Sequence, residues 1–559
     1  MKLNILNRMT KKIKVISVCE RKFFILLLIF ILSNPLFSQS PNWEWAVCAG
    51  SNGPENGSAI AADLNGNVYV TGYFYSSLVT FGTYILTNNG NYDAFIAKYD
   101  RNGNVVWAKS IGGIYDDLGS SVAIDNNGNV VVTGSFYSPA ITIGSTILNN
   151  QGVADIFVIK YDSSGNELWI KQEGGTLEEN SKAITTDLNG NIYFTGFFKS
   201  SSISSGANTL TNSGSEDFFI IKYDSLGNTI WSKSATGTGK ENGNALKTDS
   251  LGNLYATGFF YNTISFDTLN LTSLGSSDVF IVKYNNLGNE IWAKSFGGNL
   301  NDIGLGVSVD DFGSIYIVGS FLSSNFSYAA SSLFNNGDFD IFLVKYDSFG
   351  NEIWALREGG LNEESGLGIA NDKMGNVYIT GHFHSPYINF GPYIFTNSGI
   401  GDCYYAKYDS GGMLQWAKSV GGFSDDGNSS ISINDVGEIF VTGSFYSQNI
   451  SFTNMMFTNF GSSDLFVAKM EGLTTSENLK SNAIELNFYP NPSNGEFTIK
   501  CQKKIVAVTI INQLGESVYE IEGKFLDQNK MDVRFLNKGI YTAIINSEAK
   551  NNYKKFIIN

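Results

Sequence analysis

Residues 58–110 read SAIAADLNGNVYVTGYFYSSLVTFGTYILTNNGNYDAFIAKYDRNGNVVWAKS, and the same pattern recurs through most of the chain. One tryptophan marks each recurrence, at intervals of 62, 62, 62, 61, 62 and 62 residues: Trp45, Trp107, Trp169, Trp231, Trp292, Trp354 and Trp416. A glycine keeps the same step: Gly72, Gly134, Gly196, Gly258, Gly319, Gly381 and Gly443. A period this regular means that one supersecondary unit is repeated. The single missing residue lies between Gly258 and Asp278, so we expect a loop there that can absorb a deletion.

Each unit contains four runs of strand length, which in the first unit are residues 58–63, 67–74, 94–100 and 104–110. Valine, isoleucine, tyrosine, phenylalanine and threonine dominate these runs, as they do in buried pleated sheets. Asparagine and glycine separate the runs, and both tolerate the positive φ of tight hairpins. No helical period of useful length appears in the repeats. The unit therefore predicts a four-stranded antiparallel sheet in an all-β fold.

Seven such sheets packed face to face predict a seven-bladed β-propeller, and a β-solenoid is the alternative. The last unit has its first three runs, at residues 429–434, 439–445 and 465–470, but no fourth. Residues 43–50 (WEWAVCAG), in contrast, form a fourth run with no predecessors. In a closed ring this N-terminal strand can complete the seventh blade, whereas an open solenoid has no reason for the arrangement. We therefore expect a propeller that its N-terminal strand closes.

The full repeat, GG…D.G..IA.D..GNVYVTG…D.F..KYD..GN..WAKS, resembles the SBBP-type bacterial β-propeller repeat. The resemblance extends from about Trp43 to Met470, and seven copies match in step. It implies a propeller fold and says little about a ligand.

Residues 1–38 have the composition of a secretory signal peptide. Lysines and arginines precede the apolar run FFILLLIFIL at 23–32, which is too short to span a bilayer as a helix. The run ends at SNPLFSQS, where cleavage after Ser38 fits, and an uncleaved anchor is the alternative. We expect an exported mature chain without a transmembrane helix.

The composition changes towards the C-terminus. Residues 39–471 hold the predicted propeller, and residues 472–484 are polar and resemble a linker. Residues 485–559 again alternate like strands, but they lack the 62-residue unit. This last segment predicts a separate small β-sandwich.

The tail closely resembles the type A C-terminal sorting domain of the type IX secretion system of the Bacteroidetes. The matching positions are Tyr489, Pro490, Asn491, Pro492, Gly495, Gly515, Gly539, Tyr541, Lys554 and Lys555. The resemblance implies that the type IX secretion machinery is a partner and that the chain crosses the periplasm and then the outer membrane. Release into the medium, or association with the outer-membrane surface, would follow. An ordinary accessory β-domain is the alternative.

Acidic residues also keep the repeat step. The first series lies in the connection from the last strand of one blade to the first strand of the next: Glu55, Asp117, Glu179, Glu241, Asp302, Glu364 and Asp426. The second series begins the third run of each unit: Asp93, Asp155, Asp217, Asp278, Asp340, Asp402 and Asp464. In a propeller these connections reach the mouth of the central channel. We therefore expect the first series to form a ring there, with the second series on the same face.

Two interpretations of the first series are open. Each carboxylate can accept hydrogen bonds from backbone N–H groups in its loop or in the next blade, which is an architectural role. Alternatively, part of the ring binds a polar ligand or a hard cation such as calcium, which takes oxygen ligands. No other cofactor is indicated by the sequence.

Catalytic motifs are scarce. The sequence has no G-x-S-x-G elbow, Walker loop, HExxH motif or CxxC pair. His382 and His384 share one side of a predicted strand, so a metal pair is one hypothesis and a plain surface pair the other. Adjacent acids such as Asp116 and Asp117 are either glycosidase carboxylates or a solvated turn. A net charge of −15 disfavours nucleic acid as a partner.

The connections between the second and third runs vary most and are rich in tyrosine, asparagine and serine. Such residues suit hydrogen-bonding surfaces for glycans or proteins, although loops also vary because they tolerate change. We expect a secreted or surface-displayed binding, adhesion or scaffold module rather than an enzyme. The competing class is a secreted carbohydrate-active lyase or hydrolase. Such an enzyme would gather non-repeating polar residues at one channel mouth, and the sequence offers chiefly the two histidines and Arg357.

Overall fold

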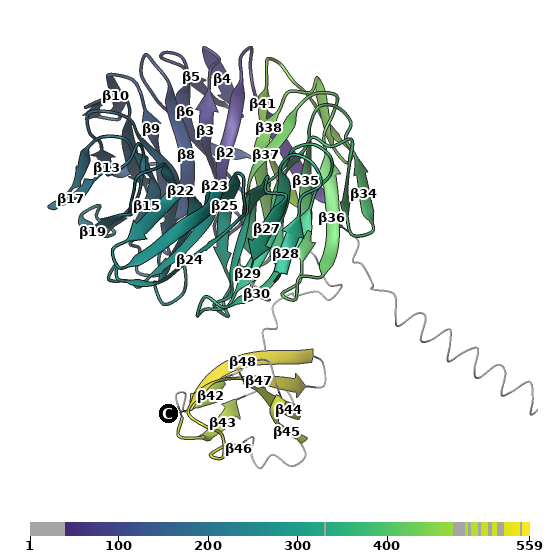
Figure 1. Ribbon diagram of the computed structural model, residues 1–559. Helices are drawn as coiled ribbons and strands as arrows, with labels where there is room; N and C mark the ends of the chain where they lie inside the picture. Colours follow the sequence, from purple (N-terminus) through teal and green to yellow (C-terminus); the bar gives the residue numbers. More distant parts are fainter. Residues whose placement is uncertain are drawn as a thin grey trace, which may run out of the picture. The chain divides into compact units, whose positions relative to one another are not determined.

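A computed structural model describes residues 40–328, 331–472, 487–489, 493–500, 505–512, 517–522, 530–547 and 550–558. The chain divides into two compact units, Met1–Leu473 and Thr474–Asn559, which Figure 1 colours purple to green and yellow. The predicted signal peptide at 1–38 and nearly all of the predicted linker at 472–484 lie outside the described residues. No helix in the described part of the chain is long and apolar enough to cross a membrane.

The first unit is built from repeated antiparallel sheets of four main strands, as the runs predict. The first strands are β2 (Glu55–Ala62), β8 (Asp117–Ile124), β14 (Glu179–Thr186), β21 (Glu241–Thr248), β25 (Asp302–Val309), β31 (Glu364–Asn371) and β37 (Asp426–Ile433). The second strands are β3 (Val68–Phe74), β9 (Val130–Phe136), β15 (Ile192–Phe198), β22 (Leu254–Phe266), β26 (Ile315–Phe321), β32 (Val377–Phe383) and β38 (Ile439–Phe445).

The outer half of each blade consists of the third and fourth strands. The third strands are β6 (Asp93–Tyr99), β12 (Asp155–Tyr161), β18 (Asp217–Tyr223), β23 (Leu269–Tyr284), β29 (Asp340–Tyr346), β35 (Asp402–Tyr408) and β41 (Asp464–Met470). The fourth strands are β7 (Val105–Ile111), β13 (Glu167–Glu173), β19 (Thr229–Ser234), β24 (Glu290–Phe296), β30 (Glu352–Glu358), β36 (Leu414–Val420) and, in the seventh blade, β1 (Trp43–Ala49).

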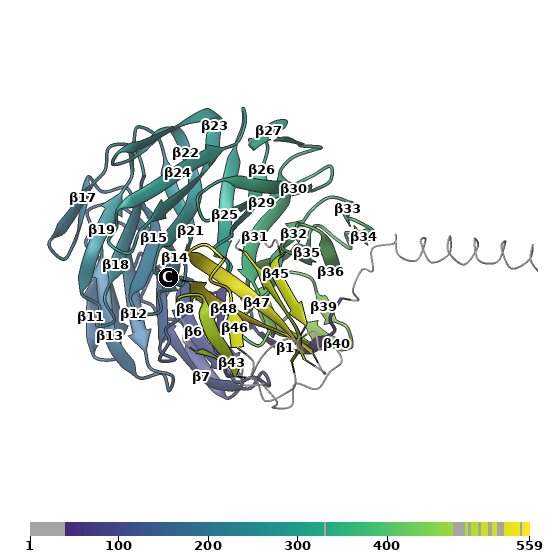
Figure 2. The ribbon, with the colours of Figure 1, turned by 90° about the horizontal axis from the view of Figure 1, so that it is seen from below.

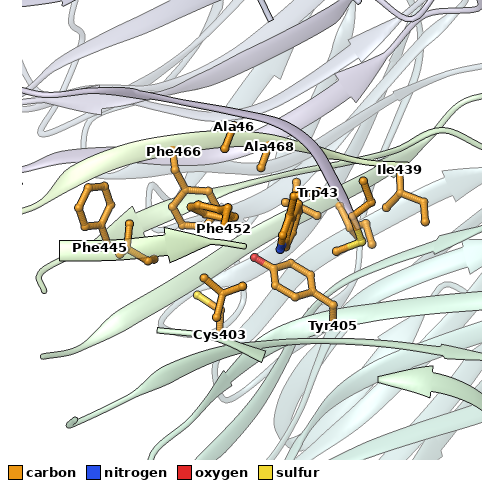
Figure 3. Close-up of a cluster of buried hydrophobic side chains, with 14 of the residues drawn as sticks. Trp43, Ala46, Cys403, Tyr405, Ile439, Phe445, Phe452, Phe466 and Ala468 are labelled. Carbon is orange, nitrogen blue, oxygen red and sulfur yellow. The ribbon is translucent and has the colours of Figure 1, made fainter. Parts of the chain in front are cut away.

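The N-terminal strand closes the ring. The seventh sheet has the order β1-β41-β38-β37, and Trp43 lies opposite Met470 in the antiparallel register. The Trp43 indole packs edge-on against Tyr405 of the preceding blade and against Phe452, with ring centroids 5.2 Å and 5.0 Å apart (Figure 3). The predicted seven-bladed propeller, closed by its own N-terminal strand, is confirmed.

The first strands form the inner circle of the ring. Each contacts the first strand of both neighbouring blades, and β37 contacts β2 to complete the circle. Side-chain bonds reinforce these contacts: the Thr248 hydroxyl donates to the carbonyl oxygen of Thr186 at 2.8 Å, and the Thr186 hydroxyl donates to that of Ile124 at 2.8 Å. Figure 2 shows the inner strands β8, β14, β21, β25 and β31 towards the middle of the ring and the outer strands β13, β19, β30 and β36 towards its periphery.

Each repeat tryptophan packs its blade against the next. The Trp45 indole N–H donates to the Arg101 carbonyl at 2.9 Å. The equivalent bonds join Trp107 to Ser163, Trp169 to Ser225, Trp231 to Asn286 and Trp354 to Ser410, at 3.1 to 3.3 Å. On the same turn Gly103 has a φ of +83°, and a Cβ there would lie 3.0 Å from the Trp45 ring. Turn glycine and tryptophan therefore form one blade-to-blade contact.

The variable connections between second and third strands are mostly hairpins rather than loops. They are β4–β5 (Leu78–Phe81, Tyr84–Thr87), β10–β11 (Ala140–Ile143, Thr146–Asn149), β16–β17 (Ser202–Ser205, Asn208–Thr211), β27–β28 (Asn325–Tyr328, Ser331–Phe334), β33–β34 (Tyr387–Phe390, Tyr393–Thr396) and β39–β40 (Asn449–Phe452, Met455–Thr458). One side of the first hairpin is buried through Val79, Phe81 and Leu86. Hairpins contact the fourth strand of their own blade and of the preceding one, as β5 and β10 both do with β7. They fill the space that opens between blades towards the outside of the ring.

The fourth blade differs, because the missing residue falls within its connection. Its second and third strands run on into one long hairpin, β22–β23, whose register shifts between Tyr261 and Thr263. Asn262 at this shift has a φ of +59°. A short strand, β20 (Thr236–Gly237), pairs with the extended part of β22. The deletion is therefore absorbed by a bulged hairpin and not by the predicted loop.

The second unit is a small all-β domain. Its sheets have the orders β42-β43-β46 and β45-β44-β47-β48. The strands are β42 (Asn487–Tyr489), β43 (Glu496–Lys500), β44 (Ile505–Ile511), β45 (Ser517–Glu522), β46 (Lys530–Asp532), β47 (Gly539–Ser547) and β48 (Lys550–Ile558). One core joins both sheets, with Phe497 and Met531 from the first and Val508, Ile545 and Phe556 from the second.

The predicted sorting residues are spread along this domain. Tyr489 ends β42, Gly539 begins β47, and Lys554 and Lys555 lie in β48. Gly495 has a φ of +89°, and a Cβ there would lie 2.8 Å from the Cα of Arg534. The Tyr541 hydroxyl donates to the Asn537 carbonyl at 2.9 Å. Pro490, Asn491, Pro492 and Gly515 lie outside the described residues.

Candidate functional site

The crossovers between blades define one end of the ring, called here the crossover face. They connect the outermost strand of one blade to the innermost strand of the next and comprise residues 50–54, 112–116, 174–178, 235–240, 297–301, 359–363 and 421–425. The second strands end and the third strands begin at this same end, since Phe74 of β3 lies opposite both Glu55 of β2 and Asp93 of β6. The hairpin turns of the repeat occupy the opposite end, called here the turn face.

The seven carboxylates of the first series each begin a first strand at the crossover face and are fully buried. Asp117 is representative. Its carboxylate accepts the N–H of Gly113 at 2.6 Å, the N–H groups of Tyr137 and Ser138 at 3.1 Å and 3.2 Å, and the Ser138 hydroxyl at 2.7 Å. These bonds hold the crossover against the end of the second strand, and burial raises the pKa of Asp117 to about 6.

A serine follows every second strand except that of the fourth blade and connects the carboxylate to the crossover. The Ser138 hydroxyl, for example, also accepts the N–H of Tyr115 at 2.9 Å. The same bond is made to Ser76, Ser200, Ser323, Ser385 and Ser447, at 2.7 to 2.9 Å. The architectural interpretation of the first series therefore has a defined geometry, in which carboxylate and serine together cap the crossover.

The fourth blade lacks this serine, because Asn262 occupies the position. Both carboxylate oxygens of Glu241 are buried without a hydrogen-bond partner among the described residues. Burial, followed by the nearby Asp217 carboxylate, raises the pKa of Glu241 to about 8. Glu241 is therefore the least satisfied carboxylate of its series.

The two acidic series meet at the blade junctions. The N–H of Asp117 donates to the carbonyl of Tyr92, the residue before Asp93, at 2.6 Å. At the junction between the fourth and fifth blades, a Cβ on Gly297 would lie 2.7 Å from the Asp278 carboxyl carbon and 2.9 Å from an oxygen of Asp302. Both carboxylates therefore lie close to this glycine. Burial raises the pKa of Asp93 to about 7, and the Asp117 charge adds to the effect.

The structure thus places each first-series carboxylate inside its own blade junction rather than in a ring open to a channel. Within the described residues, no three histidine, cysteine, aspartate or glutamate side chains are grouped so that they could hold a metal ion. Calcium binding by this series stays a prediction.

Residues that do not repeat are gathered on the crossover face. The clearest position is the third residue after the repeat glycine, which is occupied in turn by Tyr75, Tyr137, Lys199, Tyr261, Leu322, His384 and Tyr446. The residue after it is the nearly constant serine. The serine is replaced in one blade, whereas the position before it is tyrosine in four blades and lysine, leucine or histidine in the other three.

Between the second and fourth blades these residues form a continuous polar network. The Tyr137 hydroxyl donates to Glu178 at 2.8 Å, and Lys199 lies 2.5 Å from Glu178 and 3.5 Å from Glu216. Lys240 extends the network, 3.3 Å from Glu216. Although burial acts in the opposite direction, hydrogen bonds from Lys199 and Tyr137 lower the pKa of Glu178.

Two lysines lie on the inner circle, and the first of them is within range of the Glu178 and Glu216 charges. Lys182 in β14 and Lys247 in β21 are exposed although they belong to the innermost strands. Although both side chains reach solvent, the blades around them partly desolvate the ammonium groups and so lower the pKa of each, an effect that Glu178 and Glu216 partly oppose at Lys182.

The two histidines lie across the ring, at the junction of the sixth and seventh blades. His382 and His384 have ring centroids 5.0 Å apart, and His384 Nε2 lies 3.2 Å from a carboxylate oxygen of Asp425. Burial, followed by the charge of His384, lowers the pKa of His382 to about 4. The histidines do share one side of the strand, and their partner is a carboxylate of the next crossover.

Tyrosines dominate the first blade at this face. Tyr92 packs against Tyr73 and Tyr75, with ring centroids 5.3 Å apart in both pairs. Tyr75 and Tyr446 are each about half exposed.

Arg357, which the sequence analysis singled out, is not part of the Tyr137–Glu178–Lys199 network. It lies on the outer strand β30, and its Nε donates to Asp340 at 2.7 Å.

The repeat pattern does not predict most of these groups. The end of each second strand lies beside the next crossover only in the folded chain, and this brings together Tyr137, Lys199, Glu178, Glu216 and Lys240. The signal was present, however, because the variable position immediately precedes a serine at a constant 21 residues from the acid.

Residues 487–559 match the family model described as a secretion system C-terminal sorting domain. The match confirms the predicted sorting domain. It implies that the chain interacts with the type IX secretion machinery and is delivered to the cell surface or secreted. That the repeats are of the SBBP type stays a prediction.

Two curated relatives match parts of the chain. An uncharacterized WD repeat-containing protein of Acanthamoeba polyphaga mimivirus is 24% identical over 514 residues, covering 73% of this chain and 36% of that protein. The regulatory protein FlaEY of Caulobacter vibrioides is 32% identical over 114 residues, covering 20% and 12%. The chain thus spans about a third or less of the length of these relatives.

Solved structures with similar folds include YCF48 bound to D1 peptide, with a TM-score of 0.36, 11% identity, and coverage of 78% of this chain and 99% of that one. The Neurospora crassa Pan2 WD40 domain gives a TM-score of 0.38, 9% identity, and coverage of 78% and 97%. A gluconolactonase from Xanthomonas campestris gives a TM-score of 0.30, 11% identity, and coverage of 63% and 85%.

Proposed function

We propose that this protein is a binding module, displayed on or released from the cell surface, which captures a glycan or protein on the crossover face of its propeller. The observation that carries the proposal is the loss of sevenfold repetition at this face. Residues that hold the array together must repeat, and the tryptophans, serines and buried carboxylates do. Residues that depart from the repeat, such as Lys199 and His384, are free to suit a ligand.

The chemistry of the face supports binding. Tyrosine side chains offer large, rigid and amphipathic contact area at low conformational cost. The Tyr137–Glu178–Lys199–Glu216 network fixes its members by mutual hydrogen bonds and ion pairs before a ligand arrives. Preorganised groups of this kind lose little freedom on binding. An acidic chain with a net charge of −15 remains a poor partner for nucleic acid.

A secreted carbohydrate-active enzyme is the second candidate. The observation in its favour is the group formed by His382, His384 and Asp425, in which His384 is within hydrogen-bond distance of Asp425 and the His382 ring lies beside it. Such groups can transfer protons. Turnover of a polysaccharide that is lost in His384→Ala would favour this candidate over pure binding.

The test is an array of glycans and cell-surface proteins probed with the purified full-length protein. Lys199→Ala and His384→Ala remove non-repeating groups from the crossover face. Lys373→Ala is the matched control, because Lys373 forms an exposed ion pair with Asp435, at 2.7 Å, on the turn face. We expect at least one crossover-face variant to lose tenfold or more in affinity while the control binds normally. Absence of binding to every array member, or equal binding by all three variants, would contradict the proposal.

A further inference from the structure

A hollow of about 510 Å³ opens on the crossover face between the first and second blades. Its lining comes from three segments that meet there: the crossover with Tyr115 and Asp116, the segment after β9 with Tyr137, and the end of the second-blade connection with Val153. Asn91 of the first blade completes the rim. The volume falls within the range of about 300–1,000 Å³ that small-molecule sites occupy.

Backbone hydrogen bonds fix the segments that line the hollow. The N–H of Tyr115 donates to the Ser138 hydroxyl at 2.9 Å, and the N–H of Tyr137 donates to Asp117 at 3.1 Å. The N–H of Val153 donates to the carbonyl of Leu177 at 2.7 Å. A Cβ on the adjacent Gly152 would lie 2.5 Å from that carbonyl oxygen, so the close approach of the two segments requires glycine.

The lining combines aromatic faces with neutral and acidic hydrogen-bonding groups. Tyr115 and Val153 are each 52% exposed, so their surfaces are available to a ligand. Tyr137 is held in place by the bond from its hydroxyl to Glu178 at 2.8 Å. Asp116 and Asn91 supply a carboxylate and an amide. Tyr115 occurs at this crossover alone, since the equivalent positions carry Gly53, Leu177, Gly239, Leu300, Asn362 and Ser424.

We propose that this hollow binds a neutral hexose unit of a glycan chain, a proposal that rests on the binding function given above. A pyranose ring has an apolar C–H face, which packs on aromatic side chains, and hydroxyl groups, which donate to carboxylates and exchange hydrogen bonds with amides. Tyr115 and Tyr137 provide the first kind of contact, and Asp116 and Asn91 provide the second.

The charge of the lining selects among sugars. Among the residues that the structure describes, no lysine or arginine lines the hollow, whereas Asp116 contributes a negative charge. A uronate or sialate would therefore meet repulsion without a compensating cation, and a neutral sugar would not. Next to Asn91, the rings of Tyr92 and Tyr75 pack against each other at a tilt, 5.3 Å apart, and offer further aromatic surface for other units of the same glycan.

The test uses full-length protein and a panel of neutral oligosaccharides of glucose, mannose and galactose, with oligogalacturonate as the charged counterpart. Tyr115→Ala and Asp116→Asn alter the hollow. Tyr387→Ala is the matched control, because Tyr387 is 53% exposed on the hairpin β33–β34 of another blade. Thermal melting establishes that all three variants are folded.

We expect at least a tenfold loss of affinity for a neutral oligosaccharide in both hollow variants and no change in the control. Equal binding by Tyr115→Ala and the wild type, or binding of oligogalacturonate alone, would overturn the hexose proposal. A ligand lost in Lys199→Ala but retained in Tyr115→Ala would overturn it too and leave the broader binding function standing. Absence of binding by any glycan or protein would overturn both.

Discussion

Gly165 lies directly against the indole of Trp107, so closely that a Cβ on the glycine would be 3.0 Å from the ring. The two residues belong to neighbouring blades, and Gly165 has a φ of +86°, which favours glycine in any case. The tryptophan is 7% exposed and its N–H donates to Ser163 on the same turn. Tryptophan and turn glycine are thus two halves of one contact between blades.

Trp107→Ala should destabilise the propeller by about 3–5 kcal/mol, the usual cost of truncating a buried aromatic side chain to alanine. Urea denaturation followed by circular dichroism measures the change. Val106→Ala serves as the control, because Val106 is 41% exposed on the same strand and should cost far less. Equal losses in both variants would show that the blade contact is not what stabilises this junction.

The buried carboxylates predict a propeller that is more stable at mildly acidic pH than at alkaline pH. The pKa is raised to about 6 in Asp117 and Asp302, to about 7 in Asp93 and to about 8 in Glu241. Because the folded pKa values exceed the ordinary values of about 4, the stability these groups contribute is full below about pH 4. It is lost as the pH rises from about 4 to the folded pKa values of about 6 to 8, and no further loss follows above them. The melting temperature should therefore fall between pH 5 and pH 8.5.

Glu241→Gln isolates the largest contribution to this trend. The variant cannot ionise, so at pH 8.5 its melting temperature should exceed that of the wild type, and the difference should shrink towards pH 5. Glu364→Gln is the comparison, since Glu364 accepts N–H groups of Gly360 and Ser385 that a glutamine would satisfy less well. A pH-independent difference for Glu241→Gln would contradict the assignment.

Ser138→Ala should cost about 1–3 kcal/mol, the usual penalty for removing one partner of a buried hydrogen bond. The serine is fully buried and its hydroxyl joins Asp117 to the crossover at Tyr115. Ser164→Ala, in an exposed turn, should cost little. Chemical denaturation of both variants gives the comparison. If Ser138→Ala were as stable as Ser164→Ala, the Ser138 hydroxyl would not contribute to holding the crossover.

Calcium and magnesium should leave the melting temperature unchanged. The first-series carboxylates, Glu241 excepted, already accept one or more backbone N–H groups, and burial keeps their pKa values high. A cation would have to displace these donors. Differential scanning calorimetry with and without each metal distinguishes the two interpretations of the first series, and a clear upward shift with calcium would support the cation interpretation over the architectural one.

Export should depend on the second unit. A chain truncated before residue 487 lacks the sorting domain and should accumulate in the periplasm, whereas the full chain should reach the cell surface or the medium. Immunoblots of cell fractions measure the distribution. Equal secretion of both chains would show that the sorting domain is dispensable.

Much of the fold was predictable because architecture repeats. The tryptophan interval predicted the blades, and the unpaired run at residues 43–50 predicted their closure. The hairpins between second and third strands were not foreseen as packing elements, because burial of Val79 and Phe81 depends on the neighbouring blade. The candidate site was harder still. Its residues, such as Tyr137 and Lys199, are those that depart from the repeat, and only the arrangement of strand ends brings them together.

Closure of the seventh blade has a consequence for the protein after export. Strand β41 lies between β38 and β1, and the N–H of Glu471, just beyond it, donates to the carbonyl of Asn42. A protease that cuts after this point severs no strand of the ring. The first and last strands of the propeller would both remain hydrogen-bonded in the seventh sheet. Neither end of the ring would then offer an unpaired strand at which unfolding or further digestion could begin.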